Sequence, residues 1–262
     1  MWSAGCTRSN VWIAEGLLDG SRIKVERLER LQRLKLTGHP FAALSKLLNG
    51  MTGAFVGIDA PFSLPCKFLP EGPIAAWRKL LTVDPAGRPF PTGKQLVATF
   101  APDLAPTGKK VLRATEKDWR ERGMNVRSTV WNGPRGGAPF AAACMTLLAR
   151  HEGPVWSLKS GGDGATLAEA FPAAQLNKWG LPFQSYNGSK KEALANRRTI
   201  LEGLAYRELS IAPNLADECL LSADALDAVI CMFGAAAASS GRTVPMADNS
   251  MRHIEGMIAV HV

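Results

Sequence analysis

Residues 54–65, Ala-Phe-Val-Gly-Ile-Asp-Ala-Pro-Phe-Ser-Leu-Pro, join a short apolar run to an acid and two prolines. The run ending at Ile58 predicts a buried strand, which Pro61 stops. Asp59 therefore stands at the carboxyl end of a buried strand. A carboxylate there is costly to bury unless a metal ion or a hydrogen-bond network compensates its charge. The alternative is that Asp59 caps the following loop, a common use of aspartate.

Strands and helices alternate on both sides of this segment. Residues 11–17 and 22–28 predict two strands joined at Asp19-Gly20, which is a hairpin signal. Periodicity further predicts helices at 40–50, 138–150, 190–208 and 217–238, a second buried strand at 167–171, and an edge strand within 254–262. This order predicts an α/β layered fold, in which ligands bind at the carboxyl ends of strands.

Further acids lie on the predicted buried elements. Glu169 belongs to the second buried strand, and Asp224 and Asp227 are three residues apart on one face of the helix at 217–238. For Asp224 the alternative is an acid that complements the dipole at a helix N-terminus. If these acids converge with Asp59, they form an oxygen cage suited to Mg²⁺. Paired metal ions catalyse in-line displacement at phosphorus without a side-chain nucleophile.

Positive charge is concentrated in the middle of the chain. The net charge is +8, and residues 67–135 hold 13 basic against 6 acidic side chains. Cations mixed with aromatic residues suit a polyanion, whose bases stack on the aromatic rings. The candidate contacts with nucleic acid are Arg113, Lys117, Arg120 and Arg122. The alternative is a solvated basic surface. We expect one domain, residues 1–262, with an insertion at about 67–135.

The overall composition is that of an ordinary globular chain, with 46% hydrophobic and 21% charged residues. It excludes a disordered or collagen-like protein, and no apolar run approaches the roughly 20 residues of a membrane span. The five cysteines form no CxxC pair, and the start lacks the pattern of a signal peptide. We therefore expect reduced thiols, a cytoplasmic location and no membrane contact. The apolar residues 258–262 could pair two copies as a homo-oligomer.

Four segments together resemble a known family. They are Val56 to Pro65, Arg113 to Glu116, Ala168 to Ala174, and Asp224 to Cys231. In this order they resemble the domain-of-unknown-function family four-two-nine, whose members are described as predicted nucleases with a ribonuclease H fold. The resemblance implies a ribonuclease H-like mixed sheet with helices on both faces.

The resemblance also implies a chemistry, hydrolysis of phosphodiester bonds in nucleic acid with Mg²⁺ or Mn²⁺. Asp59 and Asp227, with Asp224, would bind the metal. Glu169 would be an accessory acid of the catalytic site, and Arg113 would reach a phosphate.

One position departs from the family pattern. The family's first strand carries an Asp just before a Trp-Ser-Gly loop, whereas here Met1 precedes Trp2-Ser3-Ala4-Gly5. This implies either a start further upstream or the loss of a principal ligand. A catalytically inactive nucleic-acid-binding module is therefore an alternative function. A small-molecule phosphotransferase is a weaker one, because the chain has no glycine-rich phosphate turn.

Overall fold

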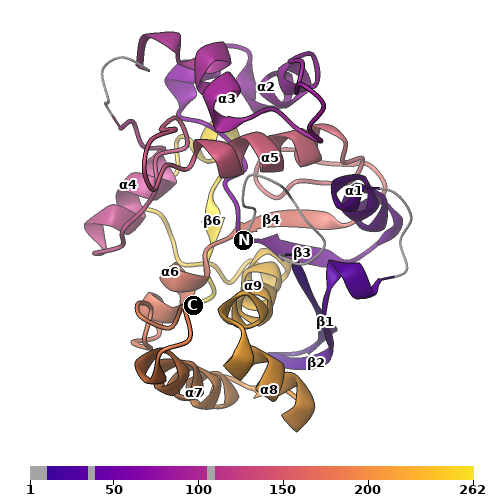
Figure 1. Ribbon diagram of the computed structural model, residues 1–262, viewed down its shortest axis with the longest axis vertical. Helices are drawn as coiled ribbons and strands as arrows, with labels where there is room; N and C mark the ends of the chain where they lie inside the picture. The colour runs from indigo at the N-terminus through magenta and orange to yellow at the C-terminus, as the bar shows by residue number, and fades with distance from the viewer. Residues whose placement is uncertain (1–10, 35–38, 105–109) are drawn as a thin grey trace.

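The computed structural model describes residues 11–34, 39–104 and 110–262, and it has a mixed α/β fold with two small sheets (Figure 1). In Figure 1, α2, α3 and α5 gather at one end and α7 and α8 at the other, with the strands and α9 between them. The helices are α1 (Pro40–Gly50), α2 (Gly72–Leu81), α3 (Gly93–Phe100), α4 (Ala114–Glu121), α5 (Ala138–Ala149), α6 (Pro172–Lys178), α7 (Lys191–Ala205), α8 (Pro213–Leu221), α9 (Ala223–Ser240) and α10 (Arg252–Glu255).

The first sheet contains the predicted hairpin. Strand β1 (Trp12–Asp19) pairs antiparallel with β2 (Arg22–Arg30), and Asp19 is the register partner of Arg22. The connection is therefore two residues long, and Gly20 adopts the positive φ of 61° that such a turn requires. Strand β5 (Leu209–Ser210) adds parallel to β2.

The second sheet carries the acids. Its order is β3 (Phe55–Ile58), β4 (Thr166–Ala170) and β6 (Ile258–Ala259), and all of its pairings are parallel. The prediction of an edge strand near the carboxyl end is confirmed by β6. Because Ile58 is the register partner of Glu169, Asp59 follows β3 beside the end of β4.

The predicted helix at 217–238 is wrong as a single element, because the chain forms α8 and α9 with a break between them. Ser222 has extended backbone angles, φ −136° and ψ 120°, and its side chain accepts a hydrogen bond from Ala225 N at 3.3 Å. Ser222 is thus the N-cap of α9, which ends before Gly241 at φ 72°. The apolar periodicity alone does not reveal the break between these two consecutive helices.

Helix α9 supports both sheets at very close range. A Cβ on Gly57 of β3 would lie 2.1 Å from the carbonyl oxygen of Cys231, and one on Gly16 of β1 would lie 2.7 Å from the Cε of Met232. These two glycines therefore let β1 and β3 approach consecutive residues of the same helix.

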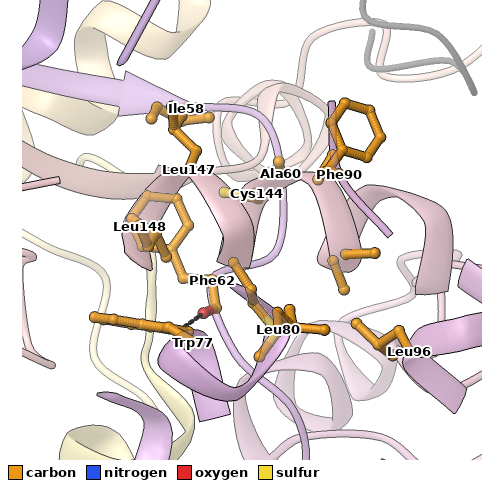
Figure 2. Packing of buried hydrophobic residues seen from close by; sticks show 14 of the residues in the cluster. Ile58, Ala60, Phe62, Trp77, Leu80, Phe90, Leu96, Cys144, Leu147 and Leu148 are labelled. Carbon is orange, nitrogen blue, oxygen red and sulfur yellow. Dashed lines mark hydrogen bonds between the residues drawn. The ribbon is translucent and has the colours of Figure 1, made fainter. Parts of the chain in front are cut away.

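Aromatic and aliphatic side chains fill the space between β3 and the helices of the middle segment (Figure 2). Trp77 of α2 donates its indole N–H to the carbonyl oxygen of Phe62 at 2.8 Å, so the loop after β3 is anchored to α2. Leu147 and Leu148 of α5 are also buried in this cluster. The segment at 67–135 thus shares its core with the sheet that carries Asp59.

One helix in the described ranges, α9, is long and apolar enough to cross a membrane, with a mean hydropathy of 1.3. However, 61% of it is buried inside the protein. A buried core helix meets the same criteria, so α9 is weak evidence for a membrane span.

We expect Gly57→Ala to lower stability by roughly 1–3 kcal/mol, because the added methyl group meets backbone atoms that cannot move aside easily. Thermal denaturation measures the loss. Gly50→Ala is the control, because a Cβ there meets no atom within 4 Å. An unchanged melting temperature for Gly57→Ala would show that β3 and α9 are less tightly packed than described.

Candidate active site

Asp59 and Asp227 come from different elements and line one cavity, whose wall also includes Glu116 and Glu169. Asp59 follows β3, Asp227 lies on the second turn of α9, and both contribute to the wall of a cavity of about 270 Å³. Both side chains are partly buried. The structure therefore brings together two of the residues that the sequence proposes as metal ligands.

The surroundings of both carboxyls disfavour their ionised forms. Burial raises the pKa of Asp59 to about 6; Arg127 opposes this rise, while the negative charges of Asp224 and Glu169 add to it. Burial also raises the pKa of Asp227 well above its ordinary value, and the charge of Asp59 raises it further. Two buried carboxyls with raised pKa values favour the binding of a proton or a cation.

Tyr186 holds Asp227 in place. Its hydroxyl donates a hydrogen bond to Asp227 Oδ1 at 2.8 Å, and its side chain is buried. The buried Arg197 of α7 donates in turn to the backbone oxygens of Tyr186 and Gly188. The sequence analysis missed Tyr186, because a single tyrosine in a polar loop has no periodicity or motif to distinguish it.

Asp224 has a different position from Asp227. It lies in the first turn of α9 and lines a second, larger cavity of about 660 Å³, whose wall also includes Asp59 and Asp227. Its charge contributes to the raised pKa of both. Asp224 thus adds negative charge to the site, and its place in the first helical turn is also favourable for the helix dipole.

Glu169 is engaged by protein groups. Its Oε1 accepts from Arg113 Nη2 at 2.5 Å, and its Oε2 accepts from Arg113 Nη1 at 2.7 Å and from Phe62 N at 3.0 Å. This bidentate pair occupies both oxygens. The geometry therefore gives Glu169 a structural role. Glu169 also lines the cavity of Asp59 and Asp227, so the accessory catalytic role that the resemblance implies stays a prediction.

Arg113 lies at the centre of this network and is only 1% exposed. Its Nε also donates to Glu116 Oε1 at 3.0 Å, and its Nη1 to the backbone oxygen of Glu255 at 3.2 Å. Burial alone would lower the pKa of Arg113, but the charges of Glu169 and Glu116 outweigh it and raise that pKa. Arg113 also lines the 270 Å³ cavity, but its guanidinium is largely engaged by Glu169, Glu116 and Glu255. A contact between Arg113 and a phosphate therefore stays a prediction.

The other predicted basic contacts remain on the surface. Lys117, Arg120 and Arg122 are exposed on α4 or at its end. Arg122 pairs with Asp118 at 2.9 Å and lies over the ring of the buried Trp119.

Arg127 is a second cation on the wall of this cavity, besides Arg113. It is exposed, lines the 270 Å³ cavity, and its charge lowers the pKa of Asp59. The Cζ atom of its guanidinium lies 5.2 Å from the centroid of the Phe140 ring. This arrangement keeps a positive charge at the mouth of the acidic cavity.

The residues described contain no group of three or more Asp, Glu, His or Cys that could hold a metal ion, so Asp59 and Asp227 would be the two carboxylates offered to a divalent cation. Mg²⁺ is commonly bound by one or two carboxylates, with waters and substrate phosphates completing its coordination. Asp59 and Asp227 meet this requirement because they face one cavity and because a cation compensates the cost of their burial.

Comparison with known proteins identifies a family. The family model described as "Protein of unknown function (DUF429)" matches residues 12–252. No significant match was found among curated proteins or among solved structures. The resemblance found in the sequence is thereby confirmed at the level of the family.

We expect the metal-free protein to lose stability as the pH rises from about 4 towards 7. The part of this loss that is due to Asp59 should be absent in Asp59→Asn. The folded pKa of Asp59, about 6, exceeds its ordinary value of 3.8, so the folded state binds more protons over this interval. Melting temperatures measured across this range test the difference between the two proteins. The exposed Asp103→Asn is the control, and identical pH profiles for wild type and Asp59→Asn would contradict the prediction.

We expect Arg113→Ala to cost on the order of 3–5 kcal/mol, because it leaves Glu169 and Glu116 buried without their counter-charge. Chemical denaturation measures this loss. If that variant does not fold, Arg113→Lys provides a milder test, since it keeps the charge and loses the bidentate geometry. The exposed Arg120→Ala is the control and should change stability by less than about 0.5 kcal/mol. Equal stability of the Arg113 and Arg120 variants would contradict the structural role.

Proposed function

The chain belongs to the DUF429 family of proteins of unknown function, and from this premise we propose that it is a metal-dependent nuclease that hydrolyses phosphodiester bonds in nucleic acid. The observation that carries the proposal is the pair Asp59 and Asp227 on one cavity wall, with the exposed Arg127 beside them. Paired carboxylates and a neighbouring cation suit the binding of a metal together with a phosphate group.

The proposed architecture is a ribonuclease H-like mixed sheet, with residues 67–135 as a basic insertion. Within the described chain, β1 and β3 each pair on one side only, and both line the 660 Å³ cavity above α9. In the proposed architecture one further extended strand lies between β1 and β3 and joins the two sheets into a single mixed sheet. The position of Met1, to which the resemblance assigns a first-strand acid, lies outside the described residues.

In the proposed mechanism Asp59 and Asp227 would hold Mg²⁺ or Mn²⁺. The ion would supply Lewis acidity, which activates the attacking water and offsets charge at the phosphate. Tyr186 fixes the orientation of Asp227 through its hydrogen bond, and Arg127 binds a non-bridging phosphate oxygen. Lys117, Arg120 and Arg122 contact the backbone of the polyanion further away.

The second candidate function is a nucleic-acid-binding module without catalysis. It is favoured by the two-carboxylate site, since no third ligand residue joins Asp59 and Asp227 in the part of the chain that the structure covers. This function predicts salt-dependent binding without turnover, weakened when Lys117, Arg120 and Arg122 are neutralised.

We expect Mg²⁺- or Mn²⁺-dependent cleavage of labelled oligonucleotides that falls by roughly a hundredfold or more in Asp59→Asn and in Asp227→Asn. Both variants replace a carboxylate with a neutral amide group of nearly the same shape. A panel of single strands, duplexes, hybrids and junctions is the substrate, and Asp103→Asn is the control.

Cleavage that persists in pure Asp59→Asn protein would contradict the proposed metal site. Salt-dependent binding without cleavage would favour the non-catalytic nucleic-acid-binding module.

A further inference from the structure

The 270 Å³ cavity is also lined by aromatic and amide side chains that have no role in the proposed metal site. Half-buried phenylalanines come from three separate segments: Phe140 at the start of α5, Phe171 after β4, and Phe183 after α6. Phe140 is already stacked under the guanidinium of Arg127. Aromatic rings at a charged mouth suit a planar, polarisable ligand.

Three side-chain amides line the same cavity. Asn125, Gln184 and Asn187 are exposed, line the cavity, and make no side-chain hydrogen bond to any other residue in the described chain. An amide presents one donor and one acceptor side by side, which matches the hydrogen-bonding edge of a nucleobase. Three uncommitted amides beside three phenyl rings therefore provide both stacking and edge recognition.

The size of the cavity restricts the ligand. Its volume of about 270 Å³ is at the lower end of ligand-binding pockets and cannot hold a double helix. A base inside a duplex is stacked and paired, so it reaches such a pocket only after it leaves the stack. Asp59 and Asp227 form part of the same wall, so a base in the cavity would have its own phosphate close to them.

We propose that this cavity binds one unstacked nucleobase and that the protein therefore acts on single-stranded nucleic acid. The proposal rests on the proposed function, which it deepens by naming the form of the substrate. Phe183 stacks on the base, Gln184 and Asn187 contact its edge, and Arg127 receives the adjoining phosphate.

Binding is measured without divalent metal, so that it does not depend on cleavage. Fluorescence anisotropy compares a labelled 12-nucleotide single strand, as DNA and as RNA, with its duplex. We expect the single strand to bind at least about tenfold more tightly, and Phe183→Ala to weaken it by roughly tenfold, the effect of one lost base stack. Phe55→Ala is the matched control, because Phe55 is exposed on β3 and does not line this cavity.

A second pair of variants guards against a folding defect in Phe183→Ala. Gln184→Ala and Asn187→Ala remove exposed side chains without hydrogen-bond partners in the described chain, and both should reduce the difference in affinity among the four homopolymers. Equal affinity for single strand and duplex, or homopolymer preferences unchanged in both amide variants, would overturn the proposal. So would a mononucleotide that competes as well as the 12-nucleotide strand.

The outcomes separate this proposal from the proposed function. Base-dependent binding of single strands, with no cleavage when Mg²⁺ or Mn²⁺ is added, would contradict the nuclease function and support the base-binding cavity. Metal-dependent cleavage with a preference for duplex would contradict the base-binding cavity and support the nuclease function.

Discussion

The buried ion pair between Arg113 and Glu169 is the interaction on which the rest of the site depends. It ties the end of β4 to the start of α4, and it reaches α10 through the backbone oxygen of Glu255. Glu169 also accepts from Phe62 N, which fixes the loop that follows Asp59. A buried pair of this kind adds little net stability over apolar packing, but its loss is costly. Its role here is therefore to fix the geometry of four segments around one cavity.

Helix α9 imposes the second constraint. It carries Asp224 and Asp227 at its amino end, and farther along it contacts β3 and β1 where each has a glycine. The same helix that supplies ligands for the proposed metal thus also sets the distance of β3, and with it the position of Asp59. A shift of α9 would therefore move both carboxylates at once.

Much of the fold follows from the sequence, because the hairpin, the buried strands and most helices have clear periodicity and turn signals. The predicted strands at 54–58 and 167–171 are observed, and Asp59 and Asp227 meet at one cavity as expected. Sequence reasoning failed for residues whose role is set by a tertiary contact with a distant part of the chain. Nothing local to Arg113 indicates that its partner lies 56 residues away in Glu169, and nothing local to Tyr186 indicates its bond to Asp227.

The parallel pairing of β3, β4 and β6 has a consequence for how the protein acquires its structure. Phe62 and Glu169 are 107 residues apart, and Arg113 and Glu255 are 142 apart. Contacts of such long range form late and slow the search for the native state. During synthesis the guanidinium of Arg113 leaves the ribosome long before its last partner does. The nascent chain must therefore carry this charge without its final enclosure, which is complete only after Glu255 has been made.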